Sequence, residues 1–243
     1  SLKERREDIA GLINYFVKKY NERENRKIKG VSGEVMKTVF SDWRNPRNEC
    51  SGGLVWFYQD LWEGAGWGIL DSSGKPKACY HYLKRILAPQ AVFVTDESLD
   101  GLHIHTVNDT PEILTAKLKL EIFQNGKIKT AKAERFIEVK PHSSLTVESD
   151  EFLGYFSDIT YSYQFGPPKH DVVRVSLTCE KTGKLISEDF YFPGSYNFSP
   201  VDLENLTATA KFLNGMVEVN LKSKTFLQNV HIDAPDFKIE NNY

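Results

Sequence analysis

The spacing of hydrophobic residues along the chain changes near Pro89. Before this proline, apolar residues recur at helical spacing in residues 4–24 and again in residues 32–43, where Ser32 is a candidate N-cap. After it, apolar and polar residues mostly alternate, as they do in half-buried strands. The pattern therefore predicts a helical N-terminal segment followed by a β-sheet region.

Residues 53–58 (GLVWFY) interrupt the helical pattern. This short, unbroken apolar run predicts a strand buried on both faces, as in a parallel sheet covered by helices. A loop of about 17 residues follows, and Pro76 then opens a predicted helix that reaches about Leu87. Helix, helix, strand, loop and helix in this order indicate a βα arrangement with one strand whose parallel partners lie outside the segment.

The alternation after Pro89 predicts an immunoglobulin-like sandwich over residues 90–195. Apolar residues alternate with polar ones in residues 114–122 and 173–179, and Asn125-Gly126 is a strong hairpin signal. Pro193-Gly194 then resembles a hinge. Beyond it, only three strands are predicted, at residues 206–210, 217–221 and 226–232, which are too few to close a second sandwich.

Composition narrows the possible partners. The 243 residues carry a formal net charge of -2, so no broad basic surface is expected and nucleic-acid binding is disfavoured. No apolar run approaches the roughly 18 residues of a membrane span, so we expect a soluble protein. The sequence begins at Ser1 rather than at methionine, so we expect the natural N-terminus to lie outside it, and the compartment is unknown.

Cysteine and histidine residues give no metal motif. The three cysteines have no zinc or redox spacing, and we interpret them as buried free thiols. His103 and His105 share one face of a predicted strand, but no third ligand is evident, so we expect no metal site and no cofactor. His81 is interpreted as a structural residue of the helix before Pro89.

Aromatic residues gather between the predicted strand and the helix that follows it. All four tryptophans lie in residues 43–67, and the loop after the strand also carries Gln59, Asp60 and Glu63. Indole rings stack on the apolar faces of sugar rings, while carboxylates and amides bind hydroxyl groups. A loop at the carboxyl end of a parallel strand is where (β/α)-barrels place their active sites. The combination therefore predicts a sugar-binding site.

Simpler interpretations stand beside this one for each single residue. A tryptophan on a buried strand, such as Trp56, is commonly part of a core. Asp71, in D-S-S-G, fits a residue that closes its own turn. Glu63 fits an exposed loop charge. Only the combination within one loop favours the sugar site.

The pattern W-x-x-x-D-x-W-x4-W-x3-D-x2-G-x2-K-A resembles the eighth strand, loop and helix of family 2 glycoside hydrolases of β-mannosidase type. The matching positions are Trp56, Asp60, Trp62, Trp67, Asp71, Gly74, Lys77 and Ala78. Where the family usually has W-Q-x-N-D-x-W-P, this chain has Phe57, Gln59 and Glu63.

The resemblance implies an α+β fold in three parts. Residues 1–89 would be the C-terminal part of a (β/α)8 barrel, that is a TIM barrel. Residues 90–195 would be an immunoglobulin-like β-sandwich. Residues 196–243 would be an incomplete second immunoglobulin-like domain. The barrel part is expected to pack against the remaining barrel of a longer parent chain.

The resemblance also implies a retaining exo-β-glycosidase with two catalytic glutamates about 5 Å apart. The family holds them in N-E and in S-E-F-G or S-E-Y-G contexts. Here Asn21-Glu22, Asn48-Glu49 and Ser187-Glu188 are not placed at the end of a barrel strand, so we assign no catalytic residue and expect the isolated chain to be inactive. Trp56, Asp60 and Trp62 match positions that shape the pocket for the terminal sugar, and are the candidate substrate-binding residues.

Three alternatives remain open. The parent could be another family 2 glycosidase, namely a β-galactosidase, a β-glucuronidase or an exo-β-glucosaminidase. Residues 90–243 could instead be a non-catalytic carbohydrate-binding module. They could also serve only as a scaffold that packs against the barrel. In each case with a barrel, apolar faces of residues 1–88 would be uncovered in the isolated chain, and we expect self-association or poor order there.

Overall fold

The computed structural model describes the chain over residues 33–50, 52–63, 66–193, 206–213, 215–228, 230–232, 234 and 237–242. The predicted helix at residues 4–24, the Ser32 cap and Gly194 of the predicted hinge lie outside these residues. The helix predicted to end before Asn45-Pro46 is α2 (Gly33–Arg44), and the helix predicted after Pro76 is α3 (Ala78–Ile86).

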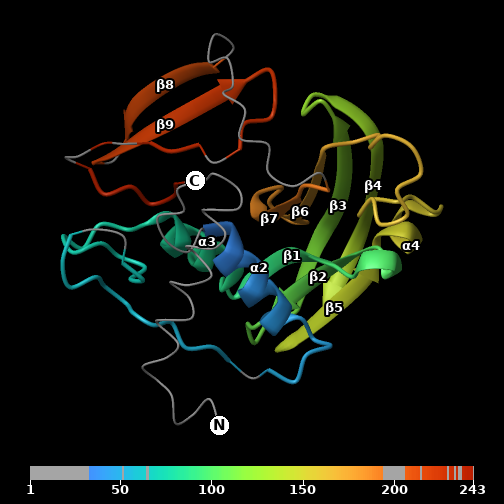
Figure 1. Ribbon diagram of the computed structural model, residues 1–243, viewed down its shortest axis with the longest axis horizontal. Coiled ribbons are helices and arrows are strands. Elements are labelled where there is room, and N and C mark those ends of the chain that lie inside the picture. The colour runs from blue at the N-terminus through green and yellow to red at the C-terminus, as the bar shows by residue number, and fades with distance from the viewer. Residues whose placement is uncertain are drawn as a thin grey trace, which may run out of the picture.

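Two antiparallel sheets form the larger part of the described chain (Figure 1). The first sheet has the strand order β1 (Gln90–Asp96), β2 (Leu102–Asn108), β5 (Ser143–Glu148). The second has the order β4 (Ile128–Val139), β3 (Leu114–Gln124), β6 (Val172–Cys179), β7 (Leu185–Tyr191). The sheets are the two layers of an immunoglobulin-like sandwich, so the predicted α+β chain with such a sandwich is confirmed.

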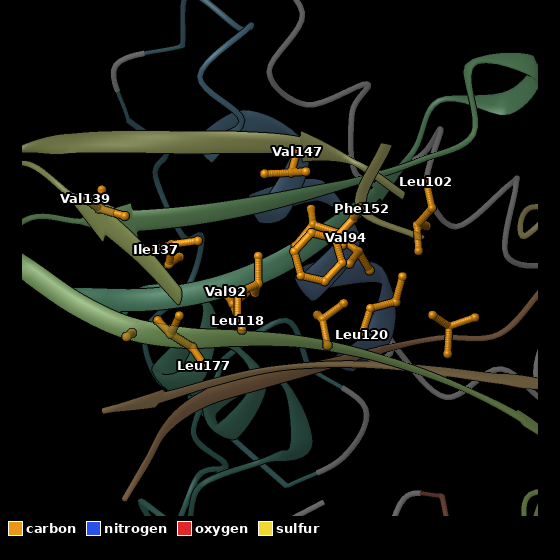
Figure 2. Packing of buried hydrophobic residues seen from close by; sticks show 14 of the residues in the cluster. Val92, Val94, Leu102, Leu118, Leu120, Ile137, Val139, Val147, Phe152 and Leu177 are labelled. Carbon is orange, nitrogen blue, oxygen red and sulfur yellow. The ribbon is translucent and has the colours of Figure 1, made fainter. Parts of the chain in front are cut away.

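The core between the two sheets follows from strand alternation. In β3, alternate residues from Leu114 to Ile122 are buried, and the lysines between them are partly exposed. Val92 and Val94 of β1 enter the same cluster from the facing sheet, as Figure 2 shows. Each such aliphatic side chain contributes roughly 1.5–3 kcal/mol when it is fully buried.

The turn between β3 and β4 forms where the sequence predicted it. Asn125 and Gly126 both have positive φ, 55° and 57°, and the Lys127 amide donates a hydrogen bond to the Gln124 carbonyl oxygen at 3.2 Å. Two successive residues with positive φ define the type I′ turn, whose twist matches the flanking strands.

The outer face of the three-stranded sheet is covered by the two helices. Phe40 of α2 and Leu83 and Ile86 of α3 form a second buried cluster with Phe93 of β1 and Val107 of β2. Every residue of β2 is consequently buried, on both faces. The helices and the sandwich therefore pack as one body over these elements.

A carboxylate on β7 joins three elements at the corner where the two sheets meet. Asp189 Oδ1 lies 2.8 Å from Lys37 Nζ of α2, and Asp189 Oδ2 accepts a hydrogen bond from the Val94 amide of β1 at 3.0 Å. Ser187 Oγ accepts another from the Val92 amide at 3.1 Å. Because β1 is an edge strand, these side chains satisfy amides that have no neighbouring strand on that side.

Two histidines lie beneath the helices on β2. His105 is fully buried, and its ring nitrogens are 2.9 Å from Thr95 Oγ1 and 2.9 Å from Thr146 Oγ1. His103 is fully buried as well, and neither of its ring nitrogens has a hydrogen-bond partner among the described residues. His81 of α3 is also buried, which agrees with its interpretation as a structural residue.

The C-terminal residues add a two-stranded antiparallel sheet, β8 (Leu206–Leu213) and β9 (Met216–Ser223). The chain after β9 returns to the sandwich, where the Phe226 amide donates a hydrogen bond to the Gly126 carbonyl oxygen at 2.7 Å. The Phe226 ring lies 5.1 Å from that of Phe190 and 5.7 Å from that of Phe192. These contacts attach the C-terminal segment to one end of the four-stranded sheet.

Three local expectations are wrong. Residues 53–58 form no strand, since no neighbouring strand in the described chain supplies a ladder of hydrogen bonds, and Leu54 is 98% exposed. Residues 226–228 and 230–232 form no strand either. Of the three thiols expected to be buried, only Cys79 is, since Cys50 is exposed and Cys179 is partly buried, although all three are free.

Stability should fall with acidification because of His105. Burial, and next the neighbouring His103, lower the pKa of His105 from 6.5 to about 4, with Glu97 opposing and Arg47 adding to the effect. Because the folded-state pKa is below the unfolded value, the unfolded chain binds the proton more tightly, so stability is complete above the unfolded pKa and declines as the pH falls toward the folded one. The loss should reach roughly 3 kcal/mol.

Urea unfolding at about pH 7.5 and about pH 4.5 measures this loss. His105→Gln should show a shallower pH dependence than the unchanged chain. His142→Gln, at an exposed histidine, should retain the full dependence. Equal pH dependence in the unchanged chain and in His105→Gln would contradict the assignment.

Asp189→Ala should destabilise the fold by about 2–4 kcal/mol, because it leaves the little-exposed Lys37 ammonium and the Val94 amide without their partner. Asp109→Ala is the matched control: this carboxylate pairs with Arg44 at 2.5 Å but is 57% exposed. The control should change the free energy of unfolding by less than about 1 kcal/mol. If the two variants lose the same stability, Asp189 does not hold the corner.

Candidate functional site

The aromatic loop predicted from the sequence connects α2 to α3, and runs along the left side of Figure 1 in cyan and teal. Residues 58–60 lie beside residues 69–70. The Asp60 amide donates to the Leu70 carbonyl oxygen at 3.1 Å, and the Leu70 amide donates to the Tyr58 carbonyl oxygen at 3.0 Å. The Lys77 amide donates to the Ile69 carbonyl oxygen at 3.0 Å. These bonds fold the loop back on itself and fix it to the start of α3.

Asp71 closes a tight turn within the loop, as its sequence context predicted. Its Oδ1 accepts hydrogen bonds from the Ser73 hydroxyl at 2.7 Å, the Lys75 amide at 2.8 Å and the Ser73 amide at 2.9 Å. The Ser73 hydroxyl is the main reason that the pKa of the Asp71 carboxyl lies below its usual value. Its role in the described loop is therefore to hold the turn.

Asp60 is the buried polar centre of the loop. Its residue is only 7% exposed, Oδ1 accepts the Gly68 amide at 2.6 Å, and Oδ2 forms an ion pair with Lys77 Nζ. The same Lys77 ammonium donates to the Gly66 carbonyl oxygen at 3.2 Å. Both carboxylate oxygens are thus engaged by the protein, so Asp60 positions the loop and offers no free oxygen to a sugar in this arrangement.

The Asp60–Lys77 pair holds the backbone on both sides of Trp67. Glycine is required at the flanking positions, since a Cβ on Gly68 would lie 2.5 Å from the Asp60 nitrogen, and one on Gly66 would overlap the Asp60 carboxylate. The half-buried Trp67 ring is consequently held at a fixed place beside Phe57, with ring centroids 6.3 Å apart and planes at 30°.

Three aromatic rings form a row on this loop. The Trp56 ring lies 5.3 Å from that of Phe57, which in turn stacks with Trp67. Trp56 is 73% exposed, so its faces are open to solvent. The planes of neighbouring rings differ by 34° and 30°, and together the rings form an apolar surface of the kind that binds the C–H face of a sugar ring.

The predicted site residues occupy different environments. Trp56 is part of the exposed row, Asp60 is buried beneath the loop, and Trp62 is 75% exposed without a ring contact to another described aromatic residue. Phe57 and Trp67 were missing from the predicted set. The signal for Trp67 was present in the sequence G-W-G, because two flanking glycines allow close approach of the backbone to a neighbouring group.

The two described glutamates that follow Asn or Ser in the family's motifs, Glu49 and Glu188, lie in places that do not form a catalytic site. Glu188 is paired with Arg174 at 2.7 Å, and Ser187 accepts the Val92 amide. Glu49 is exposed after the turn in which Asn48 donates to the Asp42 carbonyl oxygen at 2.5 Å. Asn21-Glu22 lies outside the described residues. We therefore assign no catalytic role to any of them.

Within the described residues, no group of three or more histidine, cysteine, aspartate or glutamate side chains is placed to hold a metal ion. No helix in the described part of the chain is both long enough and apolar enough to span a membrane.

Two family models match parts of the sequence. A model described as a Mannosidase Ig/CBM-like domain matches residues 100–196, the greater part of the sandwich. A model described as an AAA+ ATPase lid domain matches residues 3–44, of which the structure describes only residues 33–44.

Curated relatives are similar over most or part of the chain. Beta-mannosidase B of Aspergillus clavatus is 23% identical over 196 residues, which are 76% of this chain and 22% of the relative. Beta-mannosidase B of Thermothelomyces thermophilus is 37% identical over 80 residues, 31% of this chain and 9% of the relative. The chain thus spans less than a quarter of the length of these curated relatives.

Solved structures share the fold. A β-D-mannosidase from Dictyoglomus thermophilum superposes with a TM-score of 0.69 at 24% identity, covering 86% of this chain and 24% of that one. An exo-chitosanase from Amycolatopsis orientalis gives a TM-score of 0.58 at 14% identity, covering 79% and 25%.

The sandwich shares the fold of the C-terminal region of these solved enzymes, and the match to the Mannosidase Ig/CBM-like model and to the beta-mannosidase B proteins confirms the resemblance to family 2 glycoside hydrolases found in the sequence. Within this class, the chain resembles the C-terminal region of the β-mannosidase type.

Removing the carboxylate of Asp60 should loosen the loop. Asp60→Ala leaves the Gly68 amide without its acceptor and the Lys77 ammonium with only the Gly66 carbonyl oxygen, and should cost about 1–3 kcal/mol of unfolding free energy. Near-ultraviolet circular dichroism should also weaken, because Trp67 loses its fixed surroundings. Glu63→Ala, at an exposed carboxylate in the same loop, should leave both measurements unchanged. Identical spectra for the two variants would show that Asp60 does not order the loop.

Proposed function

We propose that this chain is the C-terminal portion of a retaining exo-β-glycosidase of β-mannosidase type, which removes terminal β-linked sugars from carbohydrate substrates. The observation that carries the proposal is the row Trp56–Phe57–Trp67, in which Trp56 is 73% exposed and Trp67 is held in place by the ion pair of the buried Asp60 with Lys77. The chain's similarity to the beta-mannosidase B proteins supports the same class of reaction.

In this proposal, residues 1–89 are the C-terminal part of a (β/α)8 barrel. The absence of a strand at residues 53–58 fits this assignment, because a parallel barrel strand requires neighbours on both sides to complete its hydrogen bonds. The exposed side chains of Leu54, Tyr58 and Leu61 would then face the preceding barrel elements of the parent chain.

Residues 90–195 are the sandwich that holds the last barrel helices, and residues 196–243 are part of a second immunoglobulin-like domain. The β8–β9 pair supports the second assignment. Its register places Ala208, Ala210 and Phe212 on one face opposite Leu221, Val219 and Val217, and this apolar face is largely exposed. A further sheet would cover such a face in a complete sandwich.

The three predicted site residues have distinct roles in the proposal. Trp56 supplies the apolar platform beneath the terminal sugar. Asp60 is a positioning residue, since its oxygens bind Lys77 and the Gly68 amide. Trp62 contributes a second exposed indole near the rim of the pocket. The catalytic glutamates of the parent lie outside this chain, which alone is inactive.

Hydrolysis of a panel of p-nitrophenyl β-glycosides by the full-length parent tests the proposal. The parent should cleave the β-mannoside, and the Trp56→Ala variant of the parent should lose at least about 1 kcal/mol in kcat/KM through the lost stacking contact. This chain alone is the control and should cleave none of the glycosides.

Preferential cleavage of the β-galactoside, β-glucuronide or β-glucosaminide would show that the parent is a different family 2 glycosidase from a β-mannosidase. An unchanged kcat/KM in the Trp56→Ala parent would remove Trp56 from the pocket. Cleavage by this chain alone would mean that it holds catalytic carboxylates.

A further inference from the structure

The sandwich carries a second exposed aromatic surface, on the segment between α4 (Ser149–Leu153) and β6. We define residues 154–171 as the aromatic loop of the sandwich. Phe165 is 76% exposed, Phe156 61% and Tyr155 55%. Tyr163 lies between two of them: its ring centroid is 5.5 Å from that of Phe156 and 5.9 Å from that of Phe165. The Tyr163 and Phe165 planes differ by only 16°.

The loop that carries the rings is held in place by hydrogen bonds and by one buried side chain. The Asp158 carboxylate accepts the Ser162 amide at 2.8 Å and the Tyr163 amide at 3.1 Å. The Tyr163 hydroxyl donates to the Leu99 carbonyl oxygen at 3.1 Å, which attaches the loop to the β1–β2 connection. Ile159, fully buried, anchors the same segment in the sandwich core.

The backbone is strained on both sides of Tyr163. Tyr161 and Gln164 have φ of 56° and 55°, in the left-handed region that non-glycine residues rarely adopt. Such conformations persist where the surrounding structure enforces them, and they gather at binding sites. Here the two left-handed residues lie beside aromatic side chains that are exposed and do not belong to the core.

The chemistry of the loop favours an uncharged ligand. Asp158 is the single charged residue in residues 154–168, and both of its oxygens are occupied by backbone amides. Lys169, the one lysine of residues 154–171, follows Pro167-Pro168 and lies outside the stretch that carries the exposed rings. The stretch with the rings therefore has no cation of its own to attract phosphates or an acidic peptide. Gln164, which is exposed between Tyr163 and Phe165 in the sequence, has an amide group that can both donate hydrogen bonds to and accept them from hydroxyl groups.

We propose that the aromatic loop of the sandwich is a second carbohydrate-binding site, distinct from the Trp56 row. It would bind a neutral oligosaccharide across Tyr163 and Phe165. The apolar C–H faces of β-linked hexopyranoses would lie on the two nearly parallel rings, and Gln164 between them would bind sugar hydroxyls. The loop lies within residues 100–196, the stretch that matches the Mannosidase Ig/CBM-like model. The choice of glucomannan as the first probe rests on the proposed function. The observation that the rings form an exposed surface is independent of it.

Affinity electrophoresis of the full 243-residue chain tests the proposal, in native gels containing soluble glucomannan, hydroxyethylcellulose or dextran. At least one of the two β-linked polysaccharides should retard the chain. Phe165→Leu keeps an apolar side chain but removes the flat ring, and should weaken binding about tenfold. Phe165→Trp should retain binding, because it keeps a flat aromatic ring.

Phe212→Leu is the matched control, because Phe212 of β8 is also 76% exposed, and this variant should bind like the unchanged chain. Retardation by hydroxyethylcellulose alone would support the second site while weakening the mannoside assignment of the parent. Three outcomes would overturn the proposal: no retardation by any polysaccharide, equal retardation of the unchanged chain and Phe165→Leu, or a change in self-association in Phe165→Leu without a change in retardation. The last would identify the loop as a protein contact.

Discussion

Burial of strand β2 on both faces is the constraint on which the rest of the described structure depends. One face packs into the core of the sandwich, and the other lies beneath α2 and α3. A sheet face that carries Phe93, His105 and Val107 requires a cover, and the polypeptide supplies it from residues that precede the sandwich in the sequence. The Asp189–Lys37 pair adds a charged contact at the edge of this layer, where β1 meets β7.

The position of the aromatic loop between α2 and α3 follows from the docking of these helices on the sheet. Its two ends are α2, which ends at Arg44, and α3, which begins at Ala78, and both helices are fixed on the sheet. Inside the loop, the buried Asp60–Lys77 pair determines where Trp67 lies, and the Trp67 ring in turn supports Phe57. The proposed sugar-binding surface therefore depends on polar contacts that lie beneath it.

Local sequence signals predicted the sandwich well. Asn125-Gly126 has the positive φ values that a type I′ turn requires, and the alternation in residues 114–122 matches the buried face of β3. The cover of the three-stranded sheet was not predicted, because β2 reads L-H-I-H-T-V-N and its histidines resemble an exposed polar face. Only the packing of the helices makes that face buried.

The strand predicted at residues 53–58 is wrong for a different reason. Its apolar run meets the condition for a buried strand, but a strand forms only where neighbours accept and donate its backbone hydrogen bonds. Likewise, the roles of Trp56, Asp60 and Trp62 could be approached from a motif, whereas the contact of Trp67 with Phe57 depends on how the loop folds back.

Hydrogen exchange followed by mass spectrometry tests most directly whether the helices and the sandwich form one cooperative body. The account predicts that amides of α2 and α3 are protected to a similar extent as those of β1 and β2, and that mild denaturant releases all four elements together. Rapid exchange in α2 and α3 while β1 and β2 remain protected would contradict it. In that case the outer face of β2 would be stable without its cover.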